Sequence, residues 1–179
     1  MALGFAVCSA PDSHISFLRD HPGIADSYLE GVVPPIESVL APLPPDWPTH
    51  APTVFNQWGV NFRNTTLYHW ILNGTSTSVG GAGAIFQTWH NPAFASLVVK
   101  LDKHNEHFAL YASQVGELAA LAQRVDLESV HRAFSDWCRS EGKRHDDIDD
   151  LACQPFVDEF REFSRLVSKA KSDGHGLIW

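Results

Sequence analysis

Residues 155–179 of the chain read PFVDEFREFSRLVSKAKSDGHGLIW, and this stretch has the clearest structural pattern in the sequence. Its apolar side chains recur every three or four residues, which is the spacing of one face of an α-helix that begins near Pro155. Gly174 ends the predicted helix, and the residues from His175 to Trp179 are apolar enough to predict a short final strand. The predicted buried face consists of Phe156, Phe160, Phe163, Val167 and Ala170.

Two further helices are predicted upstream of this stretch, beyond an acidic loop at residues 141–150. Asp126 is a good N-cap for one helix, and Ser113 is a good N-cap for another that reaches about Gln123. Phe108–Tyr111 predicts a short extended segment just before them. The helix after Asp126 has an apolar face made of Leu127, Val130, Phe134, Trp137 and Cys138.

The N-terminal half of the chain predicts one strand and three helices. The apolar run Leu3–Ser9 predicts the strand, and Asp12 or Ser13 can cap the helix that follows it. Ile24–Glu30 predicts a second helix that ends at a glycine. Asn64 is expected to cap a third helix, which ends at an Asn-Gly pair.

The segment between the third helix and residue 101 has no clear period. Thr75–Gly83 is rich in small residues and predicts a loop, and Ile85–Trp89 is compatible with a strand or a turn. The sequence does not decide which type of secondary structure the apolar segment Phe94–Leu101 forms. Gly80–Gly83 lacks the Lys-Ser or Lys-Thr pair of a phosphate-binding loop, which favours a tight or flexible turn.

A proline-rich segment spans Val33–Pro52 and contains seven prolines. Proline fixes φ and lacks an N–H donor, so no long regular element is expected here. Apolar residues between the prolines, Trp47 among them, predict an ordered loop that lies on the core rather than a flexible linker. We therefore predict one domain, residues 1–179. Its fold class is α+β, with several helices packed on a small sheet that includes the N- and C-terminal strands.

Composition and charge narrow the classes of partner. The chain has 13 Lys and Arg against 21 Asp and Glu, which gives a net charge of −8. This charge disfavours binding to nucleic acid or to anionic membrane surfaces, and it favours a basic protein partner. The three cysteines form no CxxC pair, and the apolar first residues lack the basic start of a signal peptide. A cytoplasmic protein without a cofactor is expected.

The ten histidines and six tryptophans supply the candidate site residues. His69 lies on an apolar predicted helix, where an imidazole either acts as a general base or simply hydrogen-bonds a backbone carbonyl. Trp58 and Trp89 lie in irregular segments, where aromatic side chains either line a cleft or cover the core. Together Trp58, His69 and Trp89 define a candidate cleft. No nucleophile pairs with His69 at a known spacing, and no catalytic residue is predicted.

Two polar clusters have both a functional and a structural interpretation. Asp102, His104, Glu106 and His107 lie close together, but no HExxH pattern or third ligand at a diagnostic spacing supports zinc, so no metal is predicted. The second cluster is an acidic run that either is a solvated loop or forms a landing site for a basic protein. We take this run as the candidate partner-binding site: Asp146, Asp147, Asp149 and Asp150.

The order of elements resembles the YfbM-like family of bacterial domains of unknown function. The resemblance covers the opening from Gly4 to Pro22, the segment LYHWILNG at 67–74, the helix entry YASQV at 111–115, and Phe156–Trp179. It implies no catalytic residues, because the family has none established. Because some of these proteins are encoded beside secreted toxins, the resemblance implies an immunity protein that neutralises a cognate toxin or effector. The alternative is a small-molecule-binding protein or a hydrolase with a cleft near His69.

Overall fold

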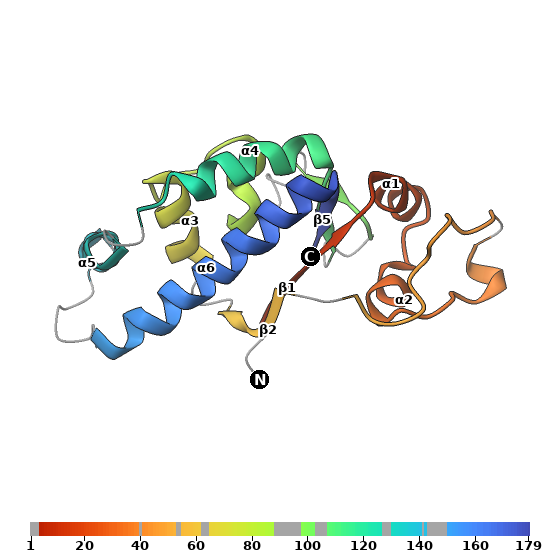
Figure 1. Cartoon of the computed structure of the whole chain (residues 1–179), viewed down its shortest axis with the longest axis horizontal. Helices are drawn as coiled ribbons and strands as arrows, with labels where there is room; N and C mark the ends of the chain where they lie inside the picture. Colours follow the sequence, from red (N-terminus) through yellow and green to blue (C-terminus); the bar gives the residue numbers. More distant parts are fainter. Residues whose placement is uncertain are drawn as a thin grey trace.

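The computed structural model of the chain describes residues 4–39, 41–52, 55–61, 65–87, 98–102, 107–126, 130–140, 142 and 150–179 (Figure 1). Its strands are β1 (Gly4–Ala10), β2 (Phe55–Asn61), β3 (Val99–Lys100), β4 (Phe108–Leu110) and β5 (Gly176–Ile178). Its α-helices are α1 (Asp12–Asp20), α2 (Ala25–Glu30), α3 (Thr65–Asn73), α4 (Ala112–Gln123), α5 (Val130–Ser140) and α6 (Asp150–Asp173). Two 3-10 helices, η1 (Ile36–Ser38) and η3 (Gly81–Gln87), complete the described elements.

The five strands form one antiparallel sheet in the order β2-β1-β5-β4-β3. Strand β1 is shared between two neighbours: its first half pairs with β2, and Cys8 to Ala10 pair with β5. Beyond β5, the backbone N–H and carbonyl of Trp179 bond those of Phe108 at 3.0 and 2.9 Å. The α+β fold with both terminal strands in the sheet is therefore confirmed.

Helices and loops cover both faces of this sheet. Val7 and Leu177 belong to a large apolar cluster with η3 and the helices α3, α4, α5 and α6. Their neighbours Cys8 and Ile178 belong to a second cluster with α1, α2 and the proline-rich segment. Figure 1 shows α4 and α6 on one side of the strands and α1 and α2 on the other. Because both faces are buried, successive residues of a strand are apolar, which explains the continuous apolar runs of β1 and β5.

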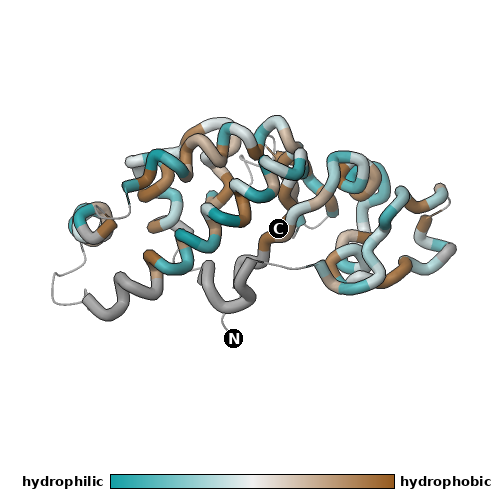
Figure 2. The backbone as a smooth tube through the Cα atoms, in the orientation of Figure 1, coloured by the Kyte–Doolittle hydropathy of each residue, from teal (hydrophilic) through white to brown (hydrophobic). Residues whose placement is uncertain are grey.

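Helix α6 buries the predicted apolar face. Each of the five residues assigned to that face from the sequence, Phe156, Phe160, Phe163, Val167 and Ala170, is buried. Hydrophilic and hydrophobic residues alternate along the helix in Figure 2. The helix begins at Asp150, however, five residues before the predicted start at Pro155. Pro155 therefore lies inside the helix and does not mark its start.

The proline-rich segment is an ordered loop on the core, as predicted. Nε1 of the buried Trp47 donates a 3.0 Å hydrogen bond to the carbonyl of Val32. Nε2 of the buried His14 donates to the carbonyl of Pro45 at 2.8 Å, so its Nδ1 accepts the hydroxyl of Tyr28 at 3.0 Å. These bonds attach the segment to α1 and α2 by specific contacts.

The predicted caps of two helices are wrong. Pro11 is the N-cap of α1, and Asp12 lies inside the first turn, where its Oδ1 accepts the N–H of Ala112 at 2.8 Å. Tyr111 is the N-cap of α4, and its N–H donates to Oε1 of Gln114 at 3.0 Å. The Asp12 carboxylate thus accepts a hydrogen bond from the first residue of α4. This contact joins distant segments, so the local sequence does not encode it.

The segments without a clear period also differ from their predictions. Gly81–Gln87 forms η3, so the end of the predicted Thr75–Gly83 loop and the start of the Ile85–Trp89 segment share one buried 3-10 helix. Of Phe94–Leu101, the described part contains β3. Strand β2 was not predicted at all, because its sequence FNQWGVN lacks an alternating pattern and is specified by pairing with β1.

Candidate functional site

His69 lies on α3 and is buried, with 1% of its surface exposed. The side-chain amide of Asn73, one turn further along the helix, donates to Nδ1 at 3.1 Å. The proton of the ring is therefore on Nε2, which donates to the carbonyl of Thr77 at 3.0 Å. Burial lowers the pKa of His69 because it disfavours the charged imidazolium. The imidazole is thus neutral and has both nitrogens engaged.

Asn73 joins α3 to the loop and to η3. Its Nδ2 also lies 3.0 Å from the carbonyl of His69 and 2.9 Å from the carbonyl of Gly83, so its two protons are shared among three acceptors. A Cβ atom on Gly83 would overlap the side chain of Asn73, so this contact requires glycine. Asn73 was predicted only as part of the Asn-Gly pair that ends the helix, where Gly74 has φ +69°, and not as a site residue.

This arrangement gives His69 a structural role. A general base needs a free lone pair within hydrogen-bond reach of the proton that it takes. The Nδ1 lone pair of His69 already accepts a hydrogen bond from Asn73, and Nε2–H donates to a backbone carbonyl. The ring therefore holds the loop after α3 in place, which is the second of the two interpretations drawn from the sequence.

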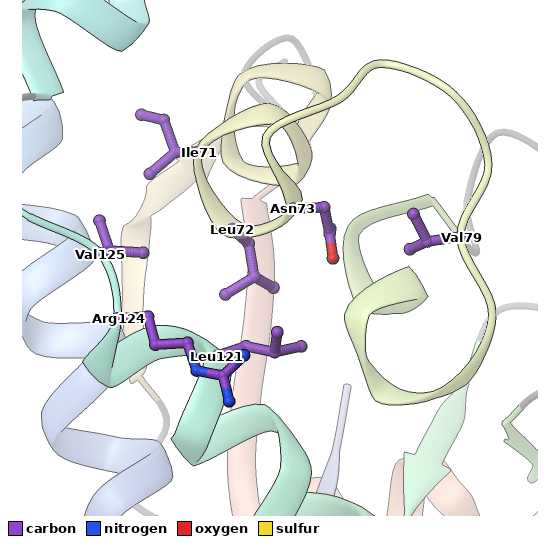
Figure 3. A pocket seen from close by; sticks show the side chains of 7 residues that line it. All are labelled: Ile71, Leu72, Asn73, Val79, Leu121, Arg124 and Val125. Carbon is purple, nitrogen blue, oxygen red and sulfur yellow. The ribbon is translucent and has the colours of Figure 1, made fainter.

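A pocket of about 280 Å³ lies next to this cluster, between the ends of α3 and α4 (Figure 3). Five of its seven lining residues are aliphatic, and Arg124 and Asn73 supply polar side chains. Its lining residues are Ile71, Leu72, Asn73, Val79, Leu121, Arg124 and Val125. A neighbouring depression of about 310 Å³ shares Leu121 and Arg124 and continues along α4 past Ala120 to Glu117. These two hollows form a continuous depression with aliphatic side chains, the Arg124 guanidinium, the Asn73 amide and the Glu117 carboxylate.

The candidate cleft predicted from the sequence differs from this pocket. His69 does not line the pocket, whereas Asn73 does. Trp58 lies in β2 with its side chain outside the described residues, and Trp89 lies outside them entirely. The structure therefore does not describe a cleft formed by these three residues. Arg124, which the sequence did not single out, comes into the pocket from the end of α4.

The acidic run lies almost wholly outside the described residues. Asp146, Asp147 and Asp149 are not described, and Asp150 is described only as the first residue of the α6 backbone. Its role as a partner-binding site therefore stays a prediction.

Two members of the other polar cluster, Asp102 and His107, are described, and both have structural contacts. The Asp102 carboxylate accepts the backbone N–H of His107, and Nε2 of His107 lies 2.9 Å from Oδ1 of Asp26 on α2. His104 and Glu106 lie outside the described residues. Within the part of the chain that the structure describes, no group of three or more His, Cys, Asp or Glu residues is arranged to hold a metal ion.

A buried phenol–carboxyl pair joins α3 to α6 and was not anticipated from the sequence. Tyr68 is fully buried and donates its hydroxyl hydrogen bond to Oε2 of the half-buried Glu159. Burial raises the pKa of Tyr68, and the bond to Glu159 adds to this effect. Burial also raises the pKa of Glu159, and the nearby Glu162 carboxylate acts in the same direction. The pair lies among aromatic rings and secures α6 against α3.

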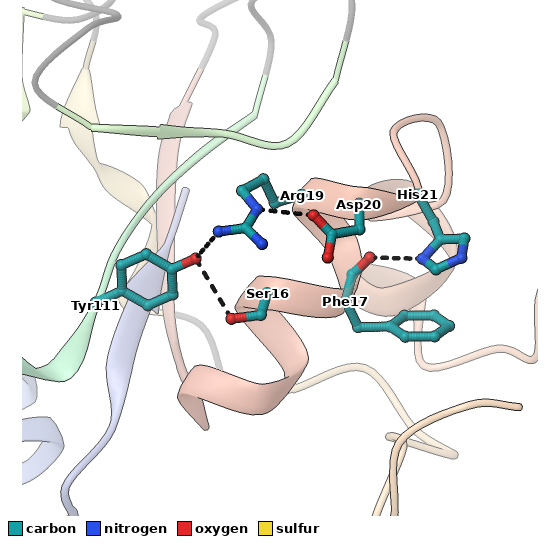
Figure 4. Close-up of polar contacts among 6 residues, drawn as sticks. All are labelled: Ser16, Phe17, Arg19, Asp20, His21 and Tyr111. Atoms are coloured by element: carbon teal, nitrogen blue, oxygen red, sulfur yellow. Dashed lines mark hydrogen bonds and ion pairs between the residues drawn. The ribbon is translucent and has the colours of Figure 1, made fainter. Parts of the chain in front are cut away.

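Residues 11–52, which we define as the N-terminal lobe, also carry an excess of acidic side chains. This lobe contains six Asp and Glu residues but only one Lys or Arg, so it carries a net charge of −5 out of −8. The one cation, Arg19, donates from Nε to Oδ1 of Asp20 at 2.8 Å and from Nη1 to the hydroxyl of Tyr111 at 3.0 Å (Figure 4). Of the other carboxylates of the lobe, Asp12 accepts the N–H of Ala112 and Asp26 lies beside His107. The remaining three, Glu30, Glu37 and Asp46, are exposed.

Comparison of the chain with protein-family models, with curated proteins and with solved structures finds no match. The similarity to YfbM-like domains therefore stays a prediction from the sequence. Among the described helices, none is long and apolar enough to cross a membrane.

Proposed function

We propose that the protein is a non-catalytic binding protein that recognises a basic protein partner. More specifically, we propose that it is an immunity protein that neutralises a cognate bacterial toxin or effector by binding it directly in the cytoplasm. The observation that carries this proposal is the acidic excess of the chain, of which residues 11–52 contribute −5 of the net −8, with Asp26, Glu30 and Glu37 exposed. A field of one sign attracts an oppositely charged protein and accelerates its association.

The use of the polar side chains also supports a binding role. The imidazoles of His14 and His69 each have both ring nitrogens in hydrogen bonds that hold loops in place. The carboxylates of Asp12 and Asp102 accept backbone N–H groups. Side chains that resemble candidates for chemistry in the sequence are thus engaged in maintaining the fold.

Binding and protection assays with the product of the neighbouring reading frame test this proposal. The two purified proteins should form a stable complex whose dissociation constant rises with salt, since screening weakens attraction between opposite charges. Cells that express both proteins should grow where cells expressing the neighbour alone do not. A neighbour that neither binds nor harms cells would contradict the proposal.

The alternative function, binding of a small molecule, has the pocket between α3 and α4 in its favour. Aliphatic walls with one guanidinium suit a small amphiphile that carries a carboxylate. Medium-chain fatty acids should then raise the melting temperature of the protein, and Arg124→Met should abolish the rise. A hydrolase with His69 as its base is less favoured, because the hydrogen bonds of that ring leave no lone pair for a substrate.

A further inference from the structure

Two adjacent valines are exposed on the N-terminal lobe. Val32 is 46% exposed and Val33 is 67% exposed, and they are the large hydrophobic residues that lie exposed in the described part of the chain. They follow Gly31, the C-cap of α2, and lie in the sequence between Glu30 and Glu37, which are both exposed. We call Val32 and Val33 the valine ridge. Single exposed apolar residues are common, but a fixed apolar pair bordered by charge has the anatomy of an interface centre and its rim.

The backbone of Val32 is held by contacts on both sides. Gly31 has φ +67° and closes α2, and a Cβ atom there would overlap the backbone of His50. The N–H of Val32 donates to the carbonyl of Ser27 at 2.9 Å, and its own carbonyl accepts Nε1 of Trp47 at 3.0 Å. The backbone of Val32 is therefore held in place without a partner, which lowers the entropy lost on binding.

The negative charge of the exposed carboxylates near the ridge indicates which kind of partner fits it. Neither Glu30 nor Glu37 makes an ion pair with a described residue, and Arg19 is already bonded to Asp20 and Tyr111. A second copy of this chain would bring like charges together at the same surface, which is unfavourable. A protein with an apolar hollow bordered by Lys and Arg has complementary shape and charge.

We infer that the valine ridge is the docking point for the basic protein partner. The two valines enter an apolar hollow of that partner, and the carboxylates of Glu30 and Glu37 face its cationic rim. This inference rests on the proposed function for the identity of the partner, but the chemistry of the surface can be tested without it.

Matched variants separate the ridge from the rest of the surface. Val33→Ser removes apolar area at the ridge without a change of charge, and Val79→Ser does the same in the pocket between α3 and α4. Glu37→Lys and Glu117→Lys each replace one exposed glutamate by lysine, so they change the net charge equally. Circular dichroism and thermal unfolding first establish that all four variants remain folded.

The first probe is a fluorescent synthetic peptide of alternating leucine and lysine, titrated by anisotropy and mapped by amide chemical shifts. We expect Val33→Ser to weaken binding roughly tenfold and Glu37→Lys to weaken it several-fold. Val79→Ser and Glu117→Lys should stay within about twofold of the wild type. The largest shifts should fall on residues 29–38 and 46–50.

The second probe is the product of the neighbouring reading frame. If it does not bind while the peptide binds through the ridge, the proposed function fails and the inference stands. If either probe binds with equal affinity to Val33→Ser and wild type, the inference is wrong. Peptide shifts centred on residues 146–150 or 121–125 would also overturn it, as would an equal loss for Glu37→Lys and Glu117→Lys.

Discussion

Replacing His69 by alanine tests whether the buried imidazole is a structural element of the α3 region. The substitution removes the hydrogen bond from Asn73 at 3.1 Å and the bond to the Thr77 carbonyl at 3.0 Å. Each such bond contributes about 1 kcal/mol, and a buried polar partner left unpaired costs about 1–3 kcal/mol. Allowing for solvation of the loop carbonyl, we expect a loss of about 3 kcal/mol in the free energy of unfolding.

Urea denaturation followed by tryptophan fluorescence measures this loss, with linear extrapolation to water. His50→Ala is the matched control, because His50 is exposed and its replacement should change stability by less than about 0.5 kcal/mol. A double-mutant cycle with Asn73→Ala should give a coupling energy on the order of 1 kcal/mol between the two side chains. A loss below about 1 kcal/mol for His69→Ala, with no coupling to Asn73, would refute the structural role and reopen a catalytic one.

Three further predictions concern pH and backbone conformation. Burial lowers the pKa of His69 below its usual 6.5, so the stability from this group is complete above that pH and is lost as the pH falls through the folded-state pKa. Urea titrations should therefore show a lower free energy of unfolding at pH 5.0 than at pH 7.5, and this difference should be smaller in His69→Ala. Burial raises the pKa of Glu159 above its usual 4.5, so its contribution is complete below that pH and is lost as the pH rises through the raised value. Glu159→Gln stays neutral and should therefore melt at an equal or higher temperature than wild type at pH 7, and a lower temperature would contradict this. Gly31→Ala should lower the free energy of unfolding by more than about 3 kcal/mol, since left-handed backbone costs alanine about 1–2 kcal/mol and the new Cβ also overlaps the backbone of His50. Gly74→Ala has open space around the new Cβ and should lose only the backbone contribution. Equal losses for the two variants would refute the overlap at Gly31.

Elements with a strong local period could be predicted from the sequence. The apolar spacing of Phe156 to Ala170 specified α6, and the apolar run to Trp179 specified β5. Gly31 correctly marked the end of α2, because only a residue that accepts positive φ fits there. In each case the residues that indicate the helix or strand lie within that element or directly next to it in the sequence.

The remaining elements depend on contacts between distant residues. Strand β2 exists because β1 offers it a partner, and η3 is fixed by the bond from Asn73 to Gly83. The pairing of Tyr68 with Glu159 joins residues 91 positions apart. Periodicity and capping rules describe neighbours along the chain, so they carry no information about these contacts.

The surface features were equally hidden from sequence analysis. The pocket forms where the ends of α3 and α4 meet, so Arg124 lines it because of how the two helices pack, which the sequence pattern does not reveal. Val32 and Val33 resemble core residues in the sequence, and only the tertiary structure places them at the surface. The charge imbalance of residues 11–52, in contrast, can be counted from the sequence directly.

Strand β5 joins the two halves of the sheet, although it follows every other element along the chain. Among the described strands, β5 alone connects the β2-β1 pair with the β4-β3 pair. During synthesis, the edges of β1 and β4 that pair with β5 therefore stay without that partner until residues 176–178 have left the ribosome. Such late, long-range closure slows folding, and the open edges leave the nascent chain prone to association with others.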